Sequence, residues 1–155
     1  MVQIVPADTS IRIQEARTLL EVYASSLDFD LDFQDFKREL AEFPGAYEEQ
    51  DSALLLAQSG DKVIGCVALR RLERGTCEMK RLYVIPELRG KGIGWSLALA
   101  VIEEARRLGY QRMRLDTVSS MRQAIKLYAD LGFKTISAYR HNPIEGAKFM
   151  ELKLR

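Results

Sequence analysis

The residues best suited to chemistry lie in a glycine-rich loop between a predicted strand and a predicted helix. The segment 84–95 is VIPELRGKGIGW, which contains three alternating glycines and two basic residues: Gly90, Gly92, Gly94, Arg89 and Lys91. No Ser, Thr, Asp or Asn stands at the start of the helix, so its first amide N–H groups lack a local acceptor and can bind an anion. Glycine lets the backbone approach that anion closely. The segment therefore predicts a pyrophosphate-binding loop.

Two common phosphate-binding motifs fit this loop poorly. The P-loop pattern Gly-x-x-x-x-Gly-Lys-Ser/Thr does not occur. The dinucleotide pattern Gly-x-Gly-x-x-Gly fails because its last glycine falls on Trp95 or on Leu97. Asp116, about twenty residues further on, imitates the acid that binds a ribose and keeps this alternative open. However, the loop follows the fourth predicted strand, whereas a dinucleotide fold places it after the first.

Covalent and metal chemistry have little support. Cys66 and Cys77 form no Cys-x-x-Cys pair, and His141 is the one histidine, so the chain has no usual zinc ligand set. Both cysteines lie in apolar, strand-like stretches, which predicts buried free thiols in a reducing compartment. We therefore expect no metal.

The periodicity of apolar residues predicts the elements that position the loop. Strands are predicted over 2–5, 52–58, 63–72, 76–85, 112–117, 133–139 and 147–154. Helices are predicted from Ser10 to about Leu27, around Phe33, Phe36 and Leu40, from the loop to about Leu108, and from the capping-box pattern Ser120-x-x-Gln123 to Gly132. The strands at 76–85 and 112–117 flank a helix and must be parallel, while the preceding strands form an antiparallel meander. A mixed sheet with helices on both faces follows.

Length and composition predict one domain over residues 1–155. The chain is 47% hydrophobic with a net charge of +1, which argues against a polybasic nucleic-acid arm. It has no signal-peptide pattern and no apolar run of about 20 residues, so we expect a cytoplasmic protein that binds neither nucleic acid nor membrane.

Three linked motifs resemble the GNAT superfamily of acyl-CoA-dependent N-acetyltransferases. They are the loop Arg89-Gly-Lys-Gly-Ile-Gly94, the preceding strand Arg81-Leu-Tyr-Val84-Ile-Pro, and the later run Ala124-Ile-Lys-Leu-Tyr128-Ala-Asp-Leu-Gly132-Phe133. The resemblance implies an α/β (α+β) fold with a mixed, mostly antiparallel, twisted sheet of six to seven strands. It also implies helices on both faces and a V-shaped gap between the two central parallel strands.

The resemblance further implies acetyl-CoA as cosubstrate. Its predicted contacts are Leu82, Tyr83, Val84, Arg89, Gly90, Lys91, Gly92, Ile93, Gly94, Trp95 and Tyr128. The loop amides would hold the pyrophosphate, and the backbone of Leu82 to Val84 would pair with the pantetheine arm. Tyr128 matches the family's general acid, although periodicity alone places it in the apolar core. The family often has Asn where this chain has Met121, which we expect to be a packing residue.

Glu78 has two possible roles. By resemblance it takes the proton of the amine, commonly through water; alternatively it forms an ion pair with Lys80 or Arg70. Strand alternation places Glu78, Lys80, Leu82 and Val84 on one face unless a bulge intervenes.

Charge is distributed unevenly along the chain. Residues 28–51 hold nine acids against two bases, and residues 70–91 hold seven bases against three acids. The basic part suits the phosphates of CoA, and the acidic part either borders a cationic amine or forms a solvated helix face. The segments 43–47 and 141–143 are candidate acceptor loops. We expect direct transfer of acetyl to a small or amino-acid-like amine by a monomer or homodimer. The alternatives are a protein or peptide acceptor, or a CoA-binding regulatory module without catalysis.

Overall fold

The computed structural model describes residues 1–27 and 36–155, which form a seven-stranded mixed sheet in the order β1-β2-β3-β4-β5-β7-β6. The strands are β1 (Val2–Pro6), β2 (Ala53–Ser59), β3 (Lys62–Glu73), β4 (Thr76–Val84), β5 (Arg112–Val118), β6 (Lys134–Ile136) and β7 (Ala147–Lys153). β4 and β5 are parallel, and the other neighbours are antiparallel. The predicted mixed, mostly antiparallel sheet is confirmed.

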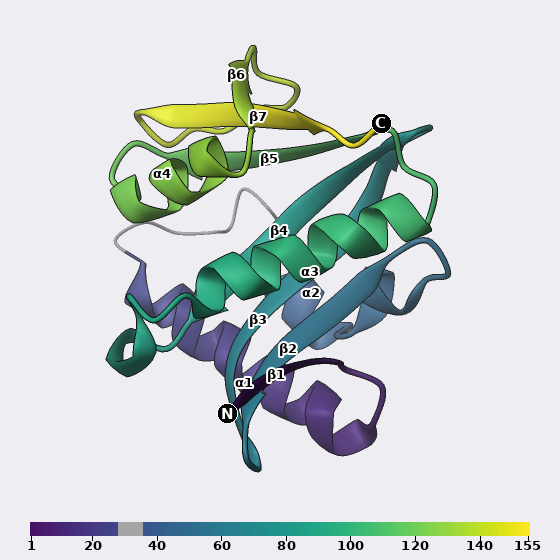
Figure 1. Ribbon diagram of the computed structural model, residues 1–155, viewed down its shortest axis with the longest axis vertical. Coiled ribbons are helices and arrows are strands. Elements are labelled where there is room, and N and C mark those ends of the chain that lie inside the picture. The colour runs from purple at the N-terminus through teal and green to yellow at the C-terminus, as the bar shows by residue number, and fades with distance from the viewer. Residues whose placement is uncertain (28–35) are drawn as a thin grey trace.

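Helices cover both faces of this sheet, as predicted. They are α1 (Ser10–Ser26), α2 (Phe36–Ala41), α3 (Ile93–Arg107) and α4 (Arg122–Asp130), with short 3-10 turns η2 (Gly45–Glu48) and η3 (Pro86–Leu88). α3 crosses in front of β2 to β4, and α1 and α2 lie behind (Figure 1). The buried face of α3 carries Leu97, Ala98 and Val101, because apolar residues three and four positions apart fall on one side of a helix. No helix in the described ranges is long and apolar enough to cross a membrane.

A bulge in β4 changes which side chains share a face. Lys80 pairs with Ala68 and Tyr83 pairs with Cys66, so β4 uses one residue more than β3 over this stretch. Arg81, at φ 60°, adopts the left-handed conformation that non-glycine residues rarely take. Lys80 and Tyr83 therefore share a face, and strict alternation across Leu82 and Val84 is broken.

β4 and β5 diverge after a short paired stretch. Their pairing covers only Thr76–Glu78 against Arg112–Arg114, whereas β5 pairs with β7 along its whole length. The two central strands therefore meet at one end and separate toward the other, where α4 lies (Figure 1). This is the predicted V-shaped gap, and one edge of β4 faces it without a partner strand in the described residues.

Two predicted boundaries are wrong. The strand expected over 133–139 is only Lys134–Ile136, because β6 pairs with just three residues of β7. The capping box at Ser120 does not form: a turn in which the Met121 amide donates to the Val118 carbonyl places Met121 at the N-cap, without a side-chain cap. Phe33, predicted on the second helix, lies outside the described residues.

Candidate active site

The glycine loop has the geometry that anion binding needs. Gly90 and Gly92 have φ of 81° and 82°, and Gly92 is the N-cap of α3 without any side-chain cap. A Cβ added at either glycine would meet nothing within 4 Å, so the backbone faces open space. Arg89 Nε donates to the Val84 carbonyl at 3.0 Å, which ties the loop to the end of β4. The first amides of α3 are therefore exposed to a ligand.

A cleft of about 690 Å³ lies against this loop. It is bounded by α1, the end of β4, the loop, the start of α3 and the start of α4. Every predicted cofactor residue except Lys91 and Tyr128 lines it; Lys91 is exposed at the loop and Tyr128 lies deeper. Ser120 and Met121 also line the cleft, so Met121, expected as a packing residue, forms part of the cleft wall.

A smaller cavity of about 70 Å³ lies in the gap between β4 and β5. It shares the lining residues Leu82 and Met121 with the large cleft, so the two spaces are neighbours on either side of these side chains. Tyr128 lines it, is 8% exposed and packs its ring against Phe133 at 5.7 Å between centroids. Burial raises the pKa of the Tyr128 phenol, which therefore stays protonated at neutral pH. Tyr128 is thus both a core residue and a wall of the gap.

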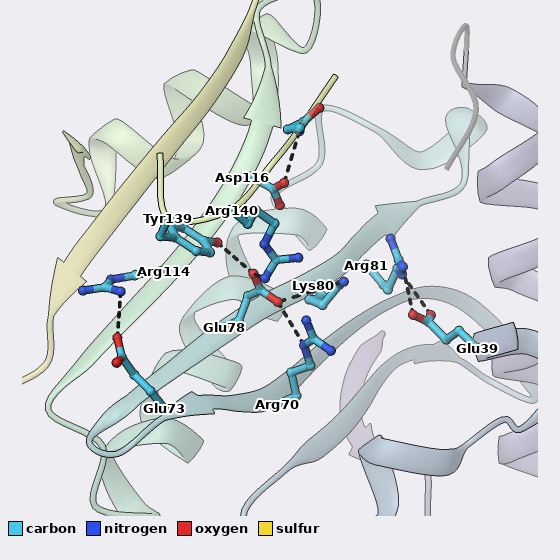
Figure 2. A network of polar contacts seen from close by, with 11 residues as sticks. Glu39, Arg70, Glu73, Glu78, Lys80, Arg81, Arg114, Asp116, Tyr139 and Arg140 are labelled. Atoms are coloured by element: carbon cyan, nitrogen blue, oxygen red, sulfur yellow. Dashed lines mark hydrogen bonds and ion pairs between the residues drawn. The ribbon is translucent and has the colours of Figure 1, made fainter. Parts of the chain in front are cut away.

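Glu78 is fully buried among cations contributed by three segments of the chain (Figure 2). One carboxylate oxygen is 3.0 Å from Arg70 Nε and 4.0 Å from Lys80 Nζ. The other accepts hydrogen bonds from the Tyr139 hydroxyl at 2.8 Å and from Arg140 Nη2. Burial alone would raise the pKa of Glu78, but the charges of these cations outweigh it and lower the pKa. Glu78 and these four partners are called the Glu78 cluster below.

Among the cations of the Glu78 cluster, Lys80 is the one whose ammonium group loses its proton most readily. Its side chain is 5% exposed, and burial, together with the charge of Arg81, lowers its pKa from 10.5 to about 7. Arg81 itself pairs with Glu39 of α2 through two hydrogen bonds, of 2.9 and 2.8 Å, which anchor the bulge of β4 to α2 (Figure 2). Lys80 therefore loses its proton more readily than an exposed lysine does.

Comparison with known proteins identifies the family. The model of the acetyltransferase (GNAT) family matches residues 14–133. The chain belongs to the GNAT family. It is 37% identical over 144 residues to an uncharacterized N-acetyltransferase of Schizosaccharomyces pombe, covering 92% of this chain and 88% of that protein. It is therefore an acyltransferase, and the alternative of a module without catalysis is set aside.

Two solved structures show the same fold. A GNAT-family acetyltransferase of Staphylococcus aureus superposes with a TM-score of 0.81 at 19% identity, over 100% of both chains. YncA of Salmonella typhimurium, a putative acetyltransferase solved with its cofactor acetyl-CoA, has a TM-score of 0.74 at 24% identity over 99% of this chain and 94% of its own. The YncA structure thus shows that a protein with this fold can bind acetyl-CoA.

Two residues near the gap, Tyr139 and Arg140, lie outside every predicted site segment, whereas Asn142 lies in the candidate acceptor loop at 141–143. Tyr139 and Arg140 follow β6 and reach Glu78, and Asn142 donates to Asp116 at 3.1 Å in the wall of the gap. Asp116 therefore lies at the gap between β4 and β5, and not in the position of the ribose-binding acid of a dinucleotide-binding fold. The only sequence signal for this group was the candidate acceptor loop at 141–143, which begins one residue after Arg140. In the described residues no three His, Cys, Asp or Glu side chains gather as a metal site.

Proposed function

We propose that this enzyme transfers an acetyl group from acetyl-CoA directly to the amine of a small or amino-acid-like acceptor. One observation carries the proposal: the uncapped start of α3 opens onto a cleft that shares the wall residues Leu82 and Met121 with the gap where Tyr128 lies. A ligand with a pyrophosphate at one end and a reactive thioester at the other fits this arrangement.

The donor half of the site is built from backbone groups. The amides at the start of α3 bind the pyrophosphate, and glycines at 90 and 92 let it approach. Beyond Glu78, β4 has no pairing with β5, so its backbone from Leu82 to Val84 can pair with an extended pantetheine arm as an added strand does. Binding of this kind fixes the thioester near Tyr128.

The chemical step needs few protein groups. The neutral amine attacks the thioester carbonyl carbon, a C–N bond forms, and the C–S bond breaks with its electron pair leaving on sulfur. The ammonium proton is lost to water; Tyr128 donates a hydrogen bond and then its proton to the leaving thiolate, and it regains a proton from solvent before the next turnover. Holding the two reactants in line supplies a large part of the rate.

Glu78, in this proposal, organises charge and does not accept the amine proton. Both of its oxygens already have cationic or hydroxyl partners, and its pKa is lowered by those cations despite burial. A carboxylate in this state is a weak base. We also place the enzyme in the cytoplasm, where the buried free thiols Cys66 and Cys77 stay reduced.

The test measures thiol release from acetyl-CoA across a panel of amines, with the acetylated product identified by mass spectrometry. We expect release that depends on a small amine. We expect Tyr128→Phe to lower kcat by about 10²-fold or more while the KM for acetyl-CoA is unchanged. Tyr110→Phe is the matched control: Tyr110 is also buried, but its hydroxyl donates to the Asp51 carbonyl outside the cleft.

Three results would contradict the proposal in different ways. Unchanged turnover in Tyr128→Phe would exclude this phenol as the acid. Acetylation of peptides or proteins in preference to small amines would favour the protein-acceptor alternative. Acetyl-CoA binding without release on any amine would exclude amine transfer.

A further inference from the structure

The Glu78 cluster holds more positive charge than its carboxylate neutralises. Arg70, Lys80 and Arg140 all pair with Glu78, which is 0% exposed. The neighbouring Arg81 is paired with Glu39, so the charges of these two residues largely cancel each other. Within the described ranges, two arginines and one lysine share one carboxylate, so the two arginines alone carry more charge than Glu78 neutralises. A second anion would pair with the arginines and would also favour the charged form of the buried Lys80, so the cluster is suited to one.

The two arginines present unused hydrogen-bond donors. Arg70 donates to Glu78 only through Nε, and Arg140 only through Nη2. The other guanidinium N–H groups of both residues make no hydrogen bond to residues in the described part of the chain. The side chains of Arg70 and Arg140 are 36% and 20% exposed, so a ligand can reach them although Glu78 is closed off. Guanidinium groups bind carboxylates through paired, charge-assisted hydrogen bonds.

The position of the cluster connects it to the reaction. Lys80 belongs to the cluster and also lines the gap cavity with Tyr128. Asp116, in the same cavity, is held by Asn142 and offsets only one of the excess charges. Lys80 thus places the cluster next to the gap, so a molecule with an anionic group at the cluster could extend beside Tyr128.

We propose that the acceptor amine also carries a carboxylate, as an amino acid does, and that Arg70, Lys80 and Arg140 bind this carboxylate. The inference rests on the acyl transfer proposed above and names its substrate class. Glu78 holds the three cations together, and the carboxylate of the acceptor supplies the second anion. The amine at the other end of the acceptor then faces the thioester.

The first test compares acceptors that differ only at the carboxylate. Amino acids and their carboxamides are offered at pH 7.5 with saturating acetyl-CoA. The amine of an amide is less basic, so more of it is neutral, and intrinsic reactivity favours the amide. We expect the opposite order, with kcat/KM at least about tenfold higher for the acid, because a charged hydrogen bond is worth that much or more.

The second test uses variants of the two arginines. Arg140→Gln and Arg70→Gln should each raise the KM for the acid about tenfold while leaving the KM for the amide and for acetyl-CoA unchanged. Arg71→Gln is the matched control, because Arg71 is the next residue on β3 but lies 4.0 Å from Asp51, outside the cluster. Stabilisation by CoA in a thermal melt verifies that each variant is folded.

The outcomes separate the two proposals. Amides acetylated as fast as acids, or equal losses on both acceptors in the arginine variants, would overturn the carboxylate inference alone. If acetyl-CoA binds but no amine of either kind is acetylated, the proposed function fails and this inference fails with it.

Discussion

Lys80→Met tests whether the buried lysine loses its charge in the folded protein. The Lys80 side chain is 5% exposed and lies among Glu78, Arg70, Arg81 and Glu39, with Asp116 in the same cavity. Its pKa falls from 10.5 to about 7 because burial penalises the ammonium. Methionine has a similar length and no charge, so the substitution removes the titration while it retains much of the packing.

The sign follows from proton linkage. Between pH 7 and pH 10.5 the unfolded chain keeps the Lys80 proton and the folded protein has lost it, so the free energy of unfolding rises with pH. One pKa unit corresponds to about 1.4 kcal/mol, and half-titration at pH 7 reduces the change between pH 7 and pH 9 to about 2 kcal/mol. The wild type gains this stability on going to pH 9, and Lys80→Met does not.

Urea unfolding at pH 7, 8 and 9 measures the effect. With m-values of about 2 kcal/mol/M, the midpoint difference between Lys80→Met and the wild type should shift by about 1 M across this range, in favour of the wild type at pH 9. Lys126→Met is the control, since Lys126 is 77% exposed and pairs with Asp130; its difference from the wild type should be independent of pH. A Lys80→Met difference that is equal at pH 7 and pH 9 would show that Lys80 stays charged when buried.

Three further predictions concern other parts of the site. The pH–rate profile of Glu78→Gln should keep its acidic limb, because Glu78 organises cations; loss of the limb would restore the role of base. Gly92→Ala and Gly109→Ala, at φ 82° and 91° with open space at the Cβ, should each lose about 1 kcal/mol of stability from strain, measured by urea unfolding, but only Gly92→Ala should raise the KM for acetyl-CoA. An equal KM in both variants would argue against the loop as the pyrophosphate site. Burial raises the pKa of Cys66 and Cys77 to about 12, so iodoacetamide at pH 8 should label neither thiol in the folded protein, as read by intact mass; rapid native labelling would contradict their burial.

The glycine loop and its place between β4 and α3 could be predicted because their signals are local. The glycines at 90 and 92, the uncapped start of α3 and the strand before them lie within about a dozen residues, and local backbone requirements determine all three. Tyr128 was found only through the family motif, since an apolar helix face looks the same whether or not it borders a cavity.

Only part of the Glu78 cluster could be predicted: the ion pairs of Glu78 with Arg70 and Lys80 were expected as an alternative and are present, whereas the contacts from Tyr139 and Arg140 join distant parts of the chain. Arg140 reaches Glu78 across 62 positions, from the segment that follows the end of β6 at Ile136. The pattern of apolar residues did not reveal where β6 ends, because the end of this strand depends on its pairing with β7, which involves three residues of β6. The bulge at Arg81 was foreseen as a possibility, but its anchor, Glu39, lies 42 positions away.

The extra residue in β4 divides one strand between two tasks. In the function proposed above, the side chains of Glu78 and Lys80, before Arg81, set the charge that the acceptor meets, and the backbone of Leu82 to Val84, after it, binds the donor. Substitutions on the first stretch can therefore change acceptor preference without altering how the donor is bound. With this division, side-chain substitutions before Arg81 would change the acceptor that is bound, while the backbone edge of β4 after Arg81 would continue to bind the donor.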